Sequence, residues 1–189
     1  FLHASSSVLK QHLFILENMT QDFVHLRMHT EFSIKDGMLN PKKVVHKAIA
    51  SGMKALAITD ATAMFGDVIF YKAASAAGIK PILGADCSIT NHSNRDDYLR
   101  LLFLARNHQG YLTLCDLLSR AWLTNQYKDR GEVDLDWITP EMADGLIVLS
   151  GFNTGAIGKA ILNGSSSAAE QEARRLSQKF PHFFMELQR

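Results

Sequence analysis

Short apolar runs alternate with helical patterns from Asp22 to the end of the chain. The runs are typical of β-strands and lie at residues 23–28, 55–59, 81–83 continuing into 85–89, 99–105, 146–149 and 183–187. The clearest helical pattern covers residues 109–125, where the spacing of a buried stripe recurs at Leu114, Leu117, Leu118, Ala121 and Trp122. Repeated strand-helix alternation predicts parallel strands joined by crossover helices. We therefore expect an α/β fold, either a barrel or an open doubly wound sheet.

The absence of nucleotide-binding and hydrolase signatures narrows these two options. Neither G-x-G-x-x-G nor G-x-x-x-x-G-K-[ST] follows a strand pattern, and there is no G-x-S-x-G elbow. A barrel is therefore the favoured interpretation. A complete (β/α)₈ barrel takes about 250 residues. Since the chain has 189 residues and six strand patterns, we expect it to stop before the barrel closes.

Composition limits the kinds of partner and the location. The chain is 47% hydrophobic and 21% charged, with 20 basic and 19 acidic residues and a net charge of +1. This balance gives no general attraction to nucleic acid. No apolar run is long enough to span a membrane, and the start lacks the features of a secretory signal. We expect a cytoplasmic protein in which residues 1–18 are an extension or non-native leader, disordered or weakly helical, before a domain over residues 19–189.

Polar residues with metal-ligand chemistry follow the predicted strands. His29 and Asp36 come after the first strand, Asp60 after the second and Asp86 beside the third. Parallel strands would bring these groups to one rim, where imidazole and carboxylates can bind a divalent cation. Arg27 opposes that interpretation, because a permanent cation repels a metal and pairs with carboxylates. The pattern is equally compatible with a salt-bridged pocket that holds no metal.

Several motifs in order resemble the polymerase-and-histidinol-phosphatase (PHP) domain family. Residues 26–33 (LRMHTEFS) with Asp36-Gly37 are similar to its first motif. The similarity to the branch found in bacterial replicative DNA polymerases continues in AITD (57–60), MFG (64–66), FYKAA (70–74), GIKPILG (78–84), LARN (104–107) and FMEL (184–187). The resemblance implies a distorted (β/α)₇ barrel similar to a TIM barrel, here truncated before closure.

The resemblance also allows the metal-ligand positions of the family to be compared one by one with the residues of this chain. Members that bind metal hold three ions with histidines, acidic residues and a Cys or His. This chain keeps the ligand types His29, Asp36 and Asp60. It departs from the pattern at five positions. Arg27, Arg100 and Ala61 each stand where the family pattern has a histidine. Asp86 stands where the pattern has Glu, and Phe152 stands where it has Cys or His. Fixed positive charge makes three bound cations electrostatically unfavourable.

The resemblance therefore implies a metal-depleted structural domain that docks a separate proofreading exonuclease subunit. Polymerisation, its Mg²⁺ ions and contact with DNA would belong to the rest of the polymerase chain, so we expect no catalytic residue and no bound cofactor here. We also predict that Arg27 and Arg100 pair with Asp36, Asp60 or Asp86. The alternatives are a metal-dependent phosphoesterase or 3'–5' exonuclease that uses His29, Asp36, Asp60 and Asp86, and a separate nucleic-acid-binding module.

Overall fold

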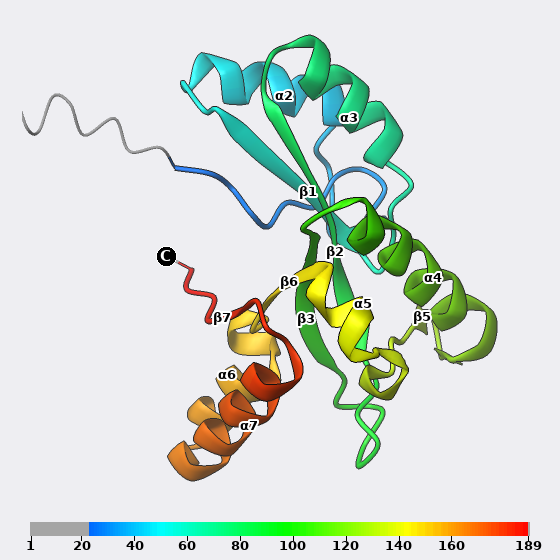
Figure 1. The fold of residues 1–189 in the computed structure, drawn as a ribbon, viewed down its shortest axis with the longest axis vertical. Coiled ribbons are helices and arrows are strands. Elements are labelled where there is room, and N and C mark those ends of the chain that lie inside the picture. Colours follow the sequence, from blue (N-terminus) through cyan, green and yellow to red (C-terminus); the bar gives the residue numbers. More distant parts are fainter. Residues whose placement is uncertain (1–22, 189) are drawn as a thin grey trace, which may run out of the picture.

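The computed structural model describes residues 23–188, so the predicted extension over residues 1–18 lies outside the described part. One mixed sheet runs through it in the order β1-β2-β3-β6-β7 (Figure 1). Its strands are β1 (Ala55–Ala61), β2 (Lys80–Ile89), β3 (Leu99–Ala105), β6 (Leu146–Leu149) and β7 (Phe183–Phe184). A second, two-stranded sheet pairs β4 (Gln126–Tyr127) with β5 (Arg130–Gly131). The mixed α/β class is confirmed, and the seven-unit barrel stays a prediction.

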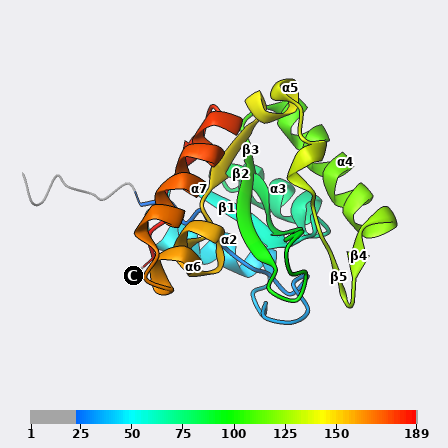
Figure 2. The ribbon, with the colours of Figure 1, turned by 90° about the horizontal axis from the view of Figure 1, so that it is seen from below.

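Helices connect most of these strands and cover the sheet. The α-helices are α2 (Pro41–Ala50), α3 (Asp67–Ala76), α4 (His108–Thr124), α5 (Pro140–Asp144), α6 (Ala156–Leu162) and α7 (Ser166–Lys179), with 3₁₀ turns η1 (Leu135–Trp137) and η2 (Phe152–Thr154). Figure 2 shows α7 and α4 flanking the sheet. Asn40 caps α2 by accepting from the backbone N–H groups of Lys42 and Lys43. Among the described residues, no helix combines the length and apolar character needed to cross a membrane.

The expectation of parallel strands throughout is wrong for β3. β1 pairs with β2 and β6 with β7 in parallel, but β3 is antiparallel to both of its neighbours. The cause is the connection between β2 and β3, which spans residues 90–98 without a helix. A short connection reverses the chain, whereas a parallel neighbour needs a crossover. The start of β3 therefore lies at the same end of the sheet as the carboxyl ends of β1 and β2.

The predicted strand over residues 23–28 is not a regular strand. The segment is extended beside β1, where the carbonyls of His25 and Met28 accept from the N–H groups of Ala57 and Thr59, each at 3.0 Å. The backbone N–H of Met28 donates instead to the Thr59 hydroxyl at 2.7 Å. Because a side chain takes the place of a backbone partner, the regular ladder is interrupted. The segment still follows the edge of the sheet.

Successive side chains along each strand point to opposite sides, so the sheet has two different faces. On the outer face, residues such as Ala85 and Phe103 pack against α4 through Leu114 and Leu117, while Ile58 packs against α3 through Phe70. On the inner face, a smaller apolar cluster contains Ala57, Leu102, Leu104 and Leu149. Neighbouring residues in register share a face, and consecutive residues in one strand do not. This rule decides which of the predicted site residues can meet.

Candidate functional site

Asp86 is the centre of the polar cluster on the inner face. Its carboxylate is fully buried, and one oxygen, Oδ2, accepts from the guanidinium groups of both Arg27 and Arg100 and from His29. The Arg100 Nη1 and His29 Nε2 atoms each lie 3.0 Å from that oxygen. The predicted ion pairs of both arginines are thus confirmed, with Asp86 as their shared partner. The other oxygen, Oδ1, has no hydrogen-bond partner within the described part of the chain.

The antiparallel course of β3 brings Arg100 to this cluster. Asp86 lies opposite Leu102, and Ser88 lies opposite Arg100, so all four side chains belong to the inner face. Arg100 is near the start of its strand, a position that an all-parallel sheet would put at the opposite end. Arg27 arrives from the extended segment beside β1. The cluster therefore depends on one antiparallel strand that the repeating sequence pattern does not predict.

Glu186 is a further member that the sequence analysis missed. Both of its carboxylate oxygens accept from Arg27, from Nε at 2.6 Å and from Nη2 at 2.8 Å. The Glu186 side chain is 7% exposed. The predicted strand over residues 183–187 is shorter in the structure, where β7 covers Phe183–Phe184. The acidic residue within the otherwise apolar run FFMEL was nevertheless a usable signal, because a carboxylate is rarely buried without a partner. We name Arg27, His29, Asp36, Asp86, Arg100 and Glu186 the Asp86 cluster.

His29 bridges two carboxylates in this cluster. Its Nδ1 lies 2.9 Å from Asp36 Oδ1, and its Nε2 lies 3.0 Å from Asp86 Oδ2. Burial lowers the pKa of His29, but the hydrogen bonds and charges of Asp86 and Asp36 outweigh burial, and the net pKa is raised. Only the protonated imidazole can donate from both nitrogens at once. The surroundings therefore favour an imidazolium, which has no free lone pair for a metal.

Asp60 does not join this cluster, so the expectation that it shares a rim site with Asp86 is wrong. Asp60 is in register with Ala85, whereas Asp86 is in register with Ala61, which puts the two carboxylates on opposite faces of the sheet.

Asp60 instead anchors the loop that follows the first segment. Its Oδ1 accepts from the Thr30 backbone N–H at 2.6 Å and from the Ser33 hydroxyl at 2.7 Å, and its Oδ2 accepts from the Thr30 hydroxyl at 2.7 Å. The loop closes at Gly37, where a Cβ atom would lie 1.8 Å from the Thr30 carbonyl oxygen. Asp60 therefore has a structural role as a buried acceptor.

The donor set of the Asp86 cluster does not fit a trinuclear metal centre. One Asp86 oxygen, Oδ2, already accepts from two guanidinium groups, and both Glu186 oxygens accept from Arg27. Ala61 and Phe152 offer no ligand atom at the positions where the PHP pattern has one. Two arginines and a protonated His29 would balance the three carboxylates, so neutrality of the cluster would need no added cation. Its chemistry is that of an internal ion-pair network.

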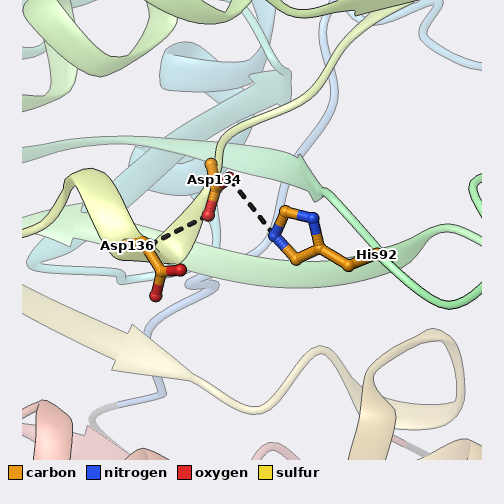
Figure 3. A group of neighbouring side chains, drawn as sticks. All are labelled: His92, Asp134 and Asp136. Carbon is orange, nitrogen blue, oxygen red and sulfur yellow. Dashed lines mark hydrogen bonds and ion pairs between the residues drawn. The ribbon is translucent and has the colours of Figure 1, made fainter.

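A second group of potential ligands lies at the surface, remote in sequence from the first. Ligand atoms of His92, Asp134 and Asp136 all fall within 4.8 Å of one another (Figure 3). His92 Nε2 lies 3.2 Å from Asp134 Oδ2, and the other oxygen of Asp134 accepts from the backbone N–H of Asp136 at 3.0 Å, which caps η1. Capping and an exposed ion pair account for this arrangement.

The chain is similar to several known proteins. The solved structure of an amidohydrolase from Chromobacterium violaceum aligns with 52% of this chain and 32% of its own, at 23% identity and a TM-score of 0.42. DNA polymerase III subunit alpha from Pseudomonas aeruginosa is 42% identical over 172 residues, which is 90% of this chain and 15% of the relative. The same subunit from Neisseria meningitidis serogroup B is 44% identical over 88% of this chain and 15% of its own.

The chain thus spans about one seventh of the length of the curated relatives it matches. The match to the PHP domain covers residues 25–189, which includes every residue of the Asp86 cluster. It also includes Asp60 and the loop that this carboxylate anchors. On that extent of similarity, the chain belongs to the PHP domain family.

Proposed function

We propose that this chain is the PHP domain at the N-terminal end of a bacterial replicative DNA polymerase alpha subunit, and that it works there as a metal-free structural domain. DNA-directed DNA synthesis is then a property of the whole polymerase chain, whose Mg²⁺-binding carboxylates belong to a separate polymerase domain. The whole subunit would contact DNA and act in the cytoplasm. Sequence identity of 42% and 44% to alpha subunits supports this assignment.

The observation that carries the metal-free role is the shared oxygen of Asp86. A divalent cation at this oxygen would lie beside the guanidinium groups of Arg27 and Arg100, which cannot be deprotonated in a protein. Repulsion between fixed charges in a partly buried site is strong because little water screens it. Metal binding at this oxygen would require both arginines to leave the carboxylate that they neutralise.

We further propose that the domain docks the proofreading exonuclease subunit of the polymerase. A domain whose own site is filled by ion pairs would need exonuclease activity from a partner. The rigid Asp86 cluster would then hold the sheet in a fixed shape on which a partner surface can form. Size-exclusion chromatography of the full alpha subunit with that exonuclease subunit tests the docking. Loss of co-elution when residues 1–189 are deleted is expected, and unchanged co-elution would refute it.

Metal analysis separates the structural role from a phosphoesterase role. We expect substoichiometric Zn, Mn and Fe in the chain purified without chelator, and no hydrolysis of p-nitrophenyl phosphate after any of these ions is added. One or more tightly bound ions per chain, with hydrolysis that Asp60→Ala abolishes, would overturn the proposal. In the matched variant Arg27→His with Arg100→His, removal of both fixed cations should increase affinity for Zn²⁺ relative to the wild type.

A further inference from the structure

A cavity of about 490 Å³ lies between α3 and α4 on the outer face of β2. Figure 1 shows these two helices along the same side of the molecule. Asp67, Tyr71 and Lys72 line the cavity from α3, and His108 and Tyr111 line it from α4. The volume is in the range of sites that hold a small ligand or a side chain. None of its described lining residues belongs to the Asp86 cluster, so the cavity is a separate feature.

Asp67 is the unusual residue of this cavity. It is 2% exposed, and neither carboxylate oxygen has a hydrogen-bond partner among the residues that the structure describes. The nearby carboxylate of Asp60 provides no donor, because both of its oxygens accept from Thr30 and Ser33. A buried carboxyl without a donor costs folding free energy. A ligand that brings donors to Asp67 would recover that cost on binding.

Two properties of the cavity favour a guanidinium group as that ligand. Its planar fork can donate two parallel hydrogen bonds to the two free oxygens of one carboxylate, which an ammonium cannot match. Tyr71, Tyr111 and His108 provide aromatic surfaces, and guanidinium groups stack on such surfaces. Val68 also lines the cavity and is 58% exposed, so apolar surface continues outward from it. This surface suits a protein segment better than a free small molecule.

We propose that the cavity between α3 and α4 is a docking pocket for an arginine side chain, presented by a partner protein segment with apolar residues beside that arginine. The guanidinium would pair with the Asp67 carboxylate, which releases its proton to solvent on binding, while the neighbouring apolar residues contact Val68 and Tyr71. Docking of a protein here would add a defined contact to the scaffold role proposed above. It does not depend on whether the Asp86 cluster holds a metal, so the two proposals can fail separately.

Titration of the ¹⁵N-labelled 189-residue chain, followed by NMR, tests the pocket. The probes are N-acetyl-arginine methylamide, the matching lysine and norleucine compounds, and the capped tripeptide Leu-Arg-Leu. We expect saturable amide shifts in α3 and the start of α4 with the arginine probe, and weaker binding of the lysine probe. The tripeptide should bind more tightly than the single residue. Equal affinities of the tripeptide and the single residue would refute a protein segment as the ligand.

Two variants that each remove one negative charge test whether the arginine probe contacts Asp67. Asp67→Asn should weaken binding of the arginine probe by about tenfold or more, because it removes a charge-assisted pair. Asp116→Asn removes the same charge from an exposed position on α4 and should leave binding unchanged. Lys72→Met removes a positive charge that lines the cavity and should strengthen binding. Equal binding by wild type and Asp67→Asn would overturn the proposal.

The comparison of probes needs no variant and covers the case in which Asp67→Asn does not fold. If the wild-type chain binds the lysine or norleucine probe as tightly as the arginine probe, the pocket does not recognise a guanidinium group. Absence of saturable shifts in α3 and α4 with every probe also overturns the assignment. Selective, saturable binding of the arginine probe at these helices supports it.

Discussion

Arg27 and Glu186 lie 159 residues apart in the sequence, yet the guanidinium of Arg27 donates two hydrogen bonds to the carboxylate of Glu186. Arg27 belongs to the segment that runs beside β1, and Glu186 follows β7. β1 and β7 are the two edge strands of the five-stranded sheet. The pair therefore links the two edges of the sheet across its inner face. Through Asp86, which also binds Arg27, the link extends to β2 in the interior of the sheet.

Removal of this pair should destabilise the chain more than removal of a surface pair. In a double-mutant cycle with Arg27→Met and Glu186→Gln, we expect a coupling energy of about 1–3 kcal/mol, because the bonds are charge-assisted and partly buried. Urea unfolding of the four proteins measures it. The exposed pair Arg174 and Glu170 on α7 is the control and should couple by about 0.5 kcal/mol or less. Equal coupling in both cycles would contradict the proposed link.

Asp86→Asn should be among the most destabilising substitutions on the inner face. It leaves Arg27, Arg100 and His29 in a partly buried site without the carboxylate that they share, and breaking such a network costs about 3–5 kcal/mol. Adding Arg100→Met to Asp86→Asn should recover part of that loss, because it removes one uncompensated charge. Urea unfolding measures both. A further loss of stability in the double variant would show that the arginine does not depend on Asp86.

Asp60→Asn tests the structural role of the other carboxylate. An amide has one acceptor oxygen and puts an NH₂ group against donors, so at least one contact to Thr30 or Ser33 is lost. We expect a cost of about 2–4 kcal/mol. Amide hydrogen exchange should speed up in residues 30–37, while the carboxylate variant Asp36→Asn, which leaves Asp60 intact, should affect that backbone less. Unchanged exchange in Asp60→Asn would mean that Asp60 does not anchor the loop.

Local signals in the sequence predict the helices and most strands, because each rests on a repeat of apolar side chains within one element. The stripe of α4 is confirmed at Leu114, Leu117, Leu118 and Ala121, which are all buried. Trp122 is 36% exposed instead, and its indole N–H donates to the Thr62 carbonyl at 2.8 Å. Aromatic side chains with a polar atom often lie at the edge of a core. Periodicity alone cannot distinguish such a position from a fully buried one.

Contacts between elements were harder to predict because they depend on strand direction and register. The sequence identifies Asp60 and Asp86 as candidates, but only the register of β1 with β2 shows that they face opposite ways. The lack of a helical pattern between Ile89 and Leu99 was a usable sign that β3 reverses direction. The contact of Glu186 with Arg27 could be predicted only by knowing which strand forms the far edge of the sheet. The residues that form such a site are therefore easier to predict from the sequence than the contacts that they make with one another.

The stability of the chain should depend on pH through Asp67. Burial, followed by the negative charge of Asp60, raises the pKa of Asp67 from 3.8 to about 8. Between these values the folded chain holds a proton that the unfolded chain has released, so stability falls as pH rises, by at most about 1.4 kcal/mol for each pH unit. His29, with its raised pKa, contributes a slope of the same sign.

Comparison of variants isolates the contribution of Asp67 from that of His29. Asp67→Asn cannot ionise, so its free energy of unfolding should fall less between about pH 5 and about pH 7 than that of the wild type, and at the higher pH it should exceed the wild-type value. Urea unfolding at both pH values measures this difference. Asp116→Asn, exposed on α4, should keep the wild-type slope. An identical slope in Asp67→Asn and wild type would show that Asp67 is not a buried, raised-pKa carboxyl, because the loss of its proton would then have no effect on folding.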